Sequence, residues 1–242
     1  MTTPPTTPAD PQALRERLRQ LGFYGLLEHW DAVHGAAWLP ELLAWEQASR
    51  QRRSLERRLR NARLGRFKLL ADFDWAWPKK LDREQIEDLL NLRFLEERAN
   101  VILVGPNGIG KSLIAKNLAH QALRAGYTVL FVTASEMLND LAAQDSASAL
   151  EKRLRRYLRP RLLALDELGY LAYGPHHVDL LFEVVSRRYG EKPLLLTTNR
   201  PFGEWNQTFP NASCVVTLVD RLVHNAEIVD TAGTQTLSSP RP

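Results

Sequence analysis

The sequence predicts an α/β fold in which a parallel sheet flanked by helices follows a small all-α amino-terminal domain. Residues 12–98 carry apolar side chains at helical spacing, whereas short aliphatic runs alternate with helical stretches from Asn100 onward. These aliphatic runs do not alternate with polar residues, which is typical of strands buried on both faces. Strands of that kind, separated by helices, indicate a parallel sheet.

The amino-terminal part is predicted to comprise a disordered tail, residues 1–11, and a helical basic domain, residues 12–70. In the first helix Leu14, Leu18 and Leu21 recur at helical spacing, and Pro11 suits a first turn. A second long helix is predicted from about Leu39 to Leu64. No basic n-region followed by an apolar h-region precedes these helices, so a secretory signal is not expected.

Positive charge is concentrated in one segment. Residues 50–68 contain nine Lys or Arg and one Glu, a local charge of +8, while the whole chain has a net charge of +4. Arginines lie on the side of the second helix opposite its apolar residues, and such like charges repel unless a partner neutralises them. We therefore predict that this face contacts duplex DNA, a solvated face being the alternative; the predicted contacts are Arg50, Arg53, Arg57 and Arg60.

A linker and a further helix are predicted over residues 71–99. The aromatic and proline residues around Trp75 mark the linker, and the helix starts at about Asp82. Asp82 is a plausible N-cap, with Gln85 completing a capping box. The predicted α/β core covers residues 100–230, with strands in "VILVG", "YTVLFVT", "RLLALDE" and "KPLLLTTN", and a tail follows over residues 231–242.

The stretch "GPNGIGKS" fits the phosphate-loop pattern G-x-x-x-x-G-K-[ST] and lies between a predicted strand and a predicted helix, as the pattern requires. Backbone N–H groups and the helix dipole would cradle phosphates there. Lys111 would reach the β- and γ-phosphates, and Ser112 would bind Mg²⁺. The predicted nucleotide-binding residues are Gly105, Pro106, Asn107, Gly108, Ile109, Gly110, Lys111, Ser112 and Leu113.

Polar residues end two further predicted strands. Asp166 follows "LLAL" at the carboxyl edge of a buried strand, where it could bind Mg²⁺ through water. Glu167 beside it could deprotonate an attacking water, which favours hydrolysis over phosphate transfer to an acceptor. Asn199 ends "LLLTT" and could contact the γ-phosphate or the water; a turn cap is its alternative role.

With these motifs, the order of phosphate loop, "LDELGYL", "TTNRPF" and "LVDRLVHNAEIV" resembles AAA+ ATPases of the DnaC and IstB type, most closely IstB-like helpers of insertion-sequence transposition, over residues 12 to 230. The resemblance implies a P-loop AAA+ core that binds ATP and Mg²⁺, forms homo-oligomers on duplex DNA, remodels it and presents it to a transposase. The arginine face of the second helix predicts DNA binding without sequence preference, because it would contact phosphates rather than bases. It assigns catalytic roles to Lys111, Asp166, Glu167 and Asn199. Arg221 is the candidate for an arginine that reaches a neighbouring subunit's γ-phosphate, with Arg200 as its rival.

Other functions remain open at this point. A replicative helicase loader of the DnaC type would share the ATPase core, but its amino-terminal region would bind a helicase protein. A small-molecule kinase would need an acceptor pocket, and a scaffold that binds nucleotide without turnover would not need Glu167. The single cysteine, Cys214, and the lack of a ~20-residue apolar run favour a cytoplasmic protein without a membrane span.

Overall fold

The computed structural model describes residues 10–73, 75, 81–170, 174–205, 209 and 212–231. The chain divides into two compact units, Met1–Arg57 and Arg58–Pro242. Most of the two predicted tails, residues 1–11 and 231–242, lies outside the described residues. No described helix is both long enough and apolar enough to cross a lipid bilayer.

The first unit is helical, as predicted. It contains α1 (Pro11–Leu21), α2 (Tyr24–Glu28), α3 (Trp30–Val33) and the first part of α4 (Trp38–Ala62). The Asp10 side chain caps α1 by accepting a hydrogen bond from the Gln12 N–H, and Gly22 ends it in the left-handed conformation. The helices enclose a small apolar core, formed by Leu14, Leu18, Trp30, Leu39 and Leu43. The prediction of a helix from about Leu39 to Leu64 is confirmed to within two residues at each end.

The second unit contains a parallel five-stranded sheet in the order β2-β3-β4-β1-β5. The strands are β1 (Asn100–Val104), β2 (Val129–Thr133), β3 (Leu162–Leu168), β4 (Leu194–Thr198) and β5 (Ala226–Asp230). The first four coincide with the predicted aliphatic runs. The sequence prediction missed β5 because its residues are of mixed polarity and only Val229 is buried in this edge strand.

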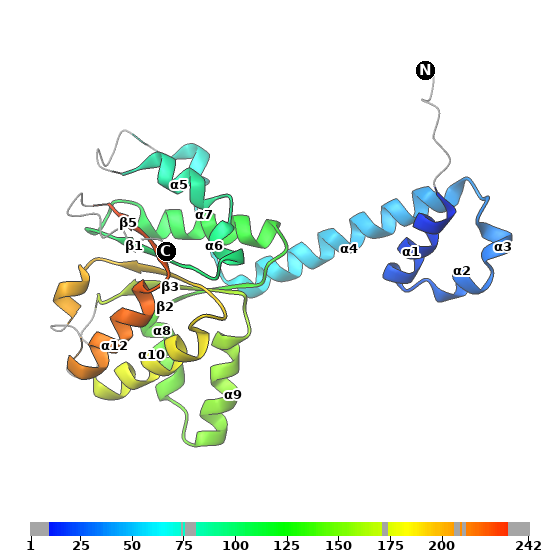
Figure 1. Cartoon of the computed structure of the whole chain (residues 1–242). Helices are drawn as coiled ribbons and strands as arrows, with labels where there is room; N and C mark the ends of the chain where they lie inside the picture. The colour runs from blue at the N-terminus through cyan, green and yellow to red at the C-terminus, as the bar shows by residue number, and fades with distance from the viewer. Residues whose placement is uncertain are drawn as a thin grey trace. The chain divides into compact units, whose positions relative to one another are not determined.

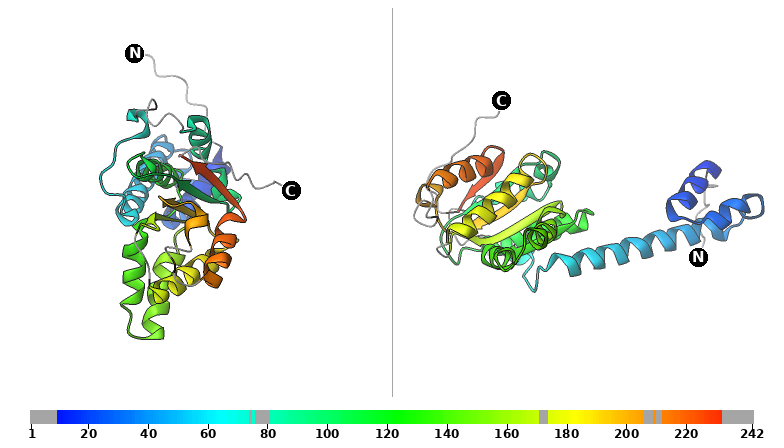
Figure 2. Two further views of the ribbon diagram at one scale, coloured as in Figure 1. Left: turned by 90° about the vertical axis from the view of Figure 1, so that its left-hand side faces the viewer. Right: turned by 90° about the horizontal axis from the view of Figure 1, so that it is seen from below.

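Helices cover both faces of the sheet. α7 (Lys111–Arg124) lies on one face, and α8 (Ala134–Ala142), α10 (Pro175–Arg188) and α12 (Ala212–Val223) lie on the other (Figures 1 and 2). α9 (Ala147–Leu158) packs against α8 and α10, contributing buried Leu154 and Tyr157. A short 3₁₀ turn, η2 (Phe202–Glu204), separates β4 from α12. The chain after Asn199 therefore supplies a helix and an edge strand of the core.

Two short helices, α5 (Arg83–Leu89) and α6 (Arg93–Glu96), precede β1. The predicted N-cap of α5 is confirmed, because the Asp82 carboxylate accepts a hydrogen bond from the Gln85 N–H at 3.1 Å. The second half of the predicted capping box is wrong. The Gln85 side chain donates instead to the carbonyl of Ile228 at 3.1 Å, and so ties α5 to edge strand β5.

Candidate nucleotide-binding site

The loop between β1 and α7 adopts a conformation that requires glycine. Gly105, Gly108 and Gly110 have φ values of 150°, 82° and 94°. A Cβ atom on Gly105 would lie 1.9 Å from Thr231 Oγ1, and one on Gly110 would lie 2.7 Å from the Phe73 ring. α7 begins directly after this loop, so the first N–H groups of the helix, which have no partner within it, face the end of the sheet where β1 stops.

Lys111, the first residue of α7, is buried and bound to its own loop. Its ammonium group donates hydrogen bonds to the carbonyls of Gly105 and Pro106, both at 2.7 Å. The pKa of the Lys111 ammonium is lowered from its usual value because the group is buried. The carboxylates of Asp166 and Glu167 oppose this shift without reversing it. A cation is thus placed at the centre of the loop, opposite two carboxylates.

Asp166 joins the loop to two strands. Its side chain is 6% exposed. Its Oδ1 atom accepts hydrogen bonds from Ser112 Oγ at 2.8 Å and from Thr197 Oγ1 at 2.5 Å. Residues far apart in the sequence, at the start of α7 and the ends of β3 and β4, therefore meet at one carboxylate oxygen.

Glu167 has an unusual backbone conformation. It lies in an irregularity of β3 between Leu165 and Leu168, and its φ is +60°, which is unfavourable for a residue with a side chain. Its N–H group donates to Thr197 Oγ1 at 2.9 Å. This conformation leaves the Glu167 side chain exposed in the pocket lining while Asp166 stays buried.

Thr197 therefore contacts both carboxylate residues through one hydroxyl, a role that the sequence analysis did not assign. Its only sequence signal is a hydroxyl residue two positions before Asn199 in "LLLTTNR". We expect Thr197→Val to lower the turnover of ATP by about tenfold while leaving its binding nearly unchanged, because the variant keeps the volume but loses both hydrogen bonds. Steady-state kinetics would check this, with Thr197→Ser, which keeps the hydroxyl, as the control. A rise in KM at unchanged turnover would contradict this positioning role.

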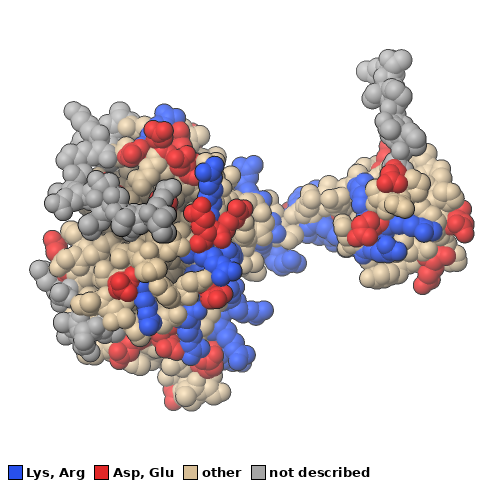
Figure 3. Space-filling view, in the orientation of Figure 1, with Lys and Arg blue, Asp and Glu red and all other residues tan. Residues whose placement is uncertain are grey.

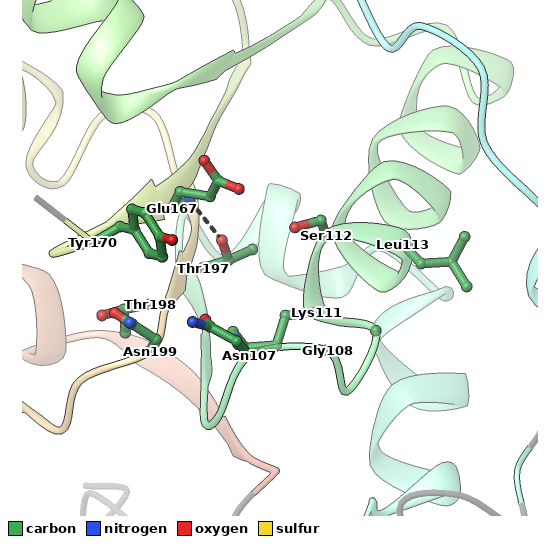
Figure 4. Close-up of a pocket in the computed structure, with 11 residues that line it drawn as sticks. Asn107, Gly108, Lys111, Ser112, Leu113, Glu167, Tyr170, Thr197, Thr198 and Asn199 are labelled. Carbon is green, nitrogen blue, oxygen red and sulfur yellow. Dashed lines mark hydrogen bonds between the residues drawn. The ribbon is translucent and has the colours of Figure 1, made fainter.

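A pocket of about 540 Å³ lies over the loop, a volume within the range of small-molecule sites. In Figure 4, Glu167 and Ser112 lie above the lower pair of Asn107 and Asn199. The side-chain oxygen of Asn199 is buried and, among the described residues, has no hydrogen-bond partner. The pocket is lined by Asn107, Gly108, Gly110, Lys111, Ser112, Leu113, Glu167, Tyr170, Thr197, Thr198 and Asn199. Four predicted residues, Gly105, Pro106, Ile109 and Asp166, do not line this pocket.

The segment before α5 is anchored to α7 by Asn117. The Asn117 amide accepts a hydrogen bond from the Leu70 N–H at 2.9 Å and donates to the Lys68 carbonyl at 3.0 Å. The 3₁₀ turn η1 (Leu70–Asp72) follows, and Phe73 then packs against Gly110 of the loop. Its ring centre lies 4.9 Å from that of Trp75. This aromatic pair is thus next to the loop, although neither ring lines the pocket.

The two candidate arginines lie outside the pocket lining. Arg221, on α12, lies over the Phe182 ring at 4.6 Å and donates a hydrogen bond to Ser186 Oγ, both on α10. Arg200 directly follows Asn199, and its carbonyl accepts a hydrogen bond from the Trp205 indole at 3.2 Å. Arg221 is therefore part of a helix–helix contact within its own subunit.

The four predicted DNA-contacting arginines have different surroundings. Arg50 and Arg53 form ion pairs with Glu46 at 2.6 and 3.5 Å, so intrahelical pairing neutralises part of the charge on this face. Contact of this face with DNA stays a prediction. The hydrogen bond from Arg50 lowers the pKa of Glu46. Arg50, Arg53 and Arg57 line one shallow groove of about 470 Å³ in the first unit, whereas Arg60 belongs to the second unit.

Comparisons with known proteins agree with this geometry. The family model described as IstB-like ATP binding protein matches residues 29–237. The chain belongs to this IstB-like family. A putative ATP-binding protein of the insertion sequence IS5376 from Geobacillus stearothermophilus is 32% identical over 92% of each chain. The corresponding protein of IS21 from Pseudomonas aeruginosa is 34% identical over 79% of this chain and 72% of its own.

The IstB-like chain has a fold shared with AAA+ proteins of solved structure. The crystal structure of DnaI aligns with a TM-score of 0.55 and 17% identity, covering 67% of this chain and 89% of its own. DnaA from Aquifex aeolicus, solved with bound AMPPCP, aligns with a TM-score of 0.57 and 17% identity, covering 70% of this chain and 51% of its own. The predicted P-loop AAA+ core is confirmed by these alignments and by the sheet order.

Proposed function

We propose that this IstB-like protein is an ATPase that assembles on duplex DNA and presents it to a transposase, with ATP hydrolysis as the switch. The observation that carries the proposal is the arrangement of Ser112, Asp166 and Glu167 around a glycine loop at the start of a helix. The family match and the insertion-sequence relatives support the biological setting.

ATP binding would use groups that already face the pocket. The N–H groups at the start of α7 would donate to the β- and γ-phosphates. Lys111 would exchange its two loop carbonyls for phosphate oxygens, which are stronger acceptors because they carry charge. The γ-phosphate would then lie in the part of the pocket near Asn107 and Asn199.

Magnesium fits the oxygen atoms present here. Among the described residues no group of three or more His, Cys, Asp or Glu could bind a metal ion. A magnesium ion at a phosphate site needs only one or two protein oxygens besides phosphate and water, and Ser112 Oγ and Asp166 Oδ1 lie 2.8 Å apart. When bound, Mg²⁺ would neutralise charge on the β- and γ-phosphates.

Hydrolysis would depend on Glu167 and Asn199. The Glu167 carboxylate is exposed in the pocket, where it can accept a proton from a water aligned with the γ-phosphate. The buried Asn199 side-chain oxygen, which lacks a partner among the described residues, can accept a hydrogen bond from the same water. Two acceptors would thus orient one nucleophile.

Assembly would complete the site if Arg221 reaches the γ-phosphate of a neighbouring subunit. We expect Arg221→Ala and Glu167→Gln each to lose nearly all turnover, and a mixture of the two to regain part of it, because some sites then combine an intact Glu167 with an intact Arg221. Loss of such an arginine lowers turnover by about 10³-fold or more. Phosphate release by mixtures of the two variants in different ratios would check this. Thermal unfolding of Arg221→Ala would show whether loss of the contact with the Phe182 ring destabilises the protein.

A mixture that is no faster than its two components would contradict this role of Arg221. The same experiment with Arg200→Ala in place of Arg221→Ala tests the rival arginine. Only the arginine that acts between subunits can restore turnover on mixing.

The proposed function is tested by sedimentation of the protein with random-sequence duplex DNA in ATP, in ADP and without nucleotide, using Glu167→Gln to maintain the ATP state. We expect large complexes only with ATP and DNA together. If the protein formed no large complexes and bound no DNA in any nucleotide state, this function would be excluded and a helicase loader would be favoured. If large complexes do form, adding the proposed partner transposase should shorten the lifetime of those formed by the wild-type protein in ATP.

A further inference from the structure

A groove of about 1110 Å³ on the second unit is lined by positively charged residues and contains no Asp or Glu among its described lining residues. It lies between the last turn of α4, the start of edge strand β2 and the carboxyl-terminal half of α9. Its seven cations are Arg58, Arg60, Arg63, Lys152, Arg155, Arg156 and Arg159. We propose that this α4–α9 groove binds the phosphate backbone of duplex DNA. The proposal rests on the proposed function and deepens it by locating DNA on the ATPase unit itself.

The α9 side of the groove is one face of a helix. Lys152, Arg155, Arg156 and Arg159 follow the spacing i, i+3, i+4, i+7, while Leu154 and Tyr157 point into the core. Figure 3 shows Lys and Arg side chains gathered on the side of the second unit where α9 lies. The sequence contains this signal as "EKRLRRYLRPR", outside the basic segment that the sequence analysis identified.

Some of the seven cations have partners, and others do not. Arg63 pairs with Glu136 at 3.2 Å and Arg156 with Asp140 at 3.4 Å. Within the described part of the chain, no carboxylate lies within 4.0 Å of three of the cations, namely Arg60, Lys152 and Arg159, and all three are exposed. Like charges placed together without a counter-ion repel one another, so a bound polyanion would be stabilising.

The wall of the groove is fixed from behind. The guanidinium of buried Arg188 donates to the carbonyls of Tyr157 and Pro160, at 2.9 and 3.1 Å, at the turn after α9. Lys192 donates to the carbonyls of Leu158 and Arg159, at 2.8 and 3.2 Å. Because these bonds use the backbone of the turn, the Arg159 side chain stays available to a ligand at a defined position.

Two features favour nucleic acid over a small anion or a protein. The groove has twice the volume of the nucleotide pocket, and its cations are spread over two helices rather than focused on one point. A competing occupant is a second copy of this chain. An acidic groove lies at the opposite edge of the sheet and has the complementary charge; it is lined by Asp82, Glu84, Asp88, Glu97 and Glu227. This acidic groove also contains Arg93, whereas all charged residues described in the α4–α9 groove are positive. The charge match between two copies is therefore incomplete.

The test compares Lys152→Gln/Arg159→Gln with the matched control Arg93→Gln/Arg98→Gln, both in the Glu167→Gln protein with ATP. Binding to a fluorescent random-sequence duplex is measured between about 0.05 and 0.3 M salt. We expect the groove variant to bind about 30-fold more weakly at 0.15 M salt, and the plot of log affinity against log salt to become shallower by roughly two units, because two phosphate contacts are lost. The control should stay within about threefold of the parent.

An unchanged affinity and salt slope for the groove variant would overturn the proposal. If Arg53→Gln/Arg57→Gln then abolished binding, DNA would be bound by α4 alone, and the proposed function would stand without the groove. If the groove variant bound DNA normally but no longer self-associated, the groove would instead be a contact between copies of this chain. Absence of DNA binding by the parent in every nucleotide state would overturn the proposed function and the groove together.

Discussion

Replacing Glu167 with Gln is expected to leave ATP binding intact and to slow hydrolysis by at least about 100-fold. A general base contributes about 10²- to 10⁴-fold to a reaction rate, and the amide cannot accept the proton of the attacking water. Gln has nearly the same shape as Glu, and the backbone hydrogen bond from Glu167 to Thr197 does not involve the side chain. Binding of a fluorescent ATP analogue should therefore be unchanged, while release of phosphate should fall.

The matched control is Glu97→Gln, which removes an exposed carboxylate that does not line the nucleotide pocket. This control should bind and hydrolyse ATP as the parent protein does. If Glu167→Gln turned over ATP at the parental rate, Glu167 would not be the base, and hydrolysis would have to be assigned to another group.

Replacing Lys111 with Ala is expected to weaken ATP binding by about 100-fold or more. Lys111 is the cation nearest the loop carbonyls and would donate charge-assisted hydrogen bonds to two phosphates, each worth about 1.5–3 kcal/mol. Without ATP binding, assembly on DNA should also disappear. Isothermal titration with ATP and sedimentation with duplex DNA would measure the two effects.

Lys116→Ala is the control for Lys111→Ala, because Lys116 lies on the same helix and its ammonium group faces the Phe131 ring, 5.4 Å from its centre, rather than the loop. Both variants should keep their helical circular dichroism. Normal ATP affinity in a folded Lys111→Ala protein would show that the loop does not bind phosphates in the proposed way.

The fold could largely be predicted from the sequence, because each strand of the sheet interior contains an uninterrupted run of three or four aliphatic residues. β1, β3 and β4 are buried on both faces, so their pattern does not depend on tertiary detail. β5 could not be found in this way, since an edge strand with mixed polarity resembles a loop. The capping box failed for a related reason: Gln85 finds a tertiary partner in Ile228, which local sequence does not reveal.

The candidate site was predictable where a motif fixes geometry by itself. The glycine spacing and Lys111 determine the loop, and strand ends bring Asp166 and Asn199 to the same edge of the sheet. Thr197 was missed because its hydroxyl accepts a hydrogen bond from the Glu167 N–H, in a backbone conformation with positive φ. No local sequence pattern predicts that conformation. The α4–α9 groove was missed because it joins Arg60 to Lys152 and Arg159, which are distant in the sequence.

The central claim, that one subunit's nucleotide pocket is completed when copies assemble on DNA, is tested most directly by measuring ATP hydrolysis per subunit against protein concentration, with and without duplex DNA. Subunits that supply a catalytic arginine to one another should hydrolyse faster as concentration rises, and DNA should shift this rise to lower concentration. A rate per subunit that is independent of both protein concentration and DNA, at saturating ATP, would contradict the account.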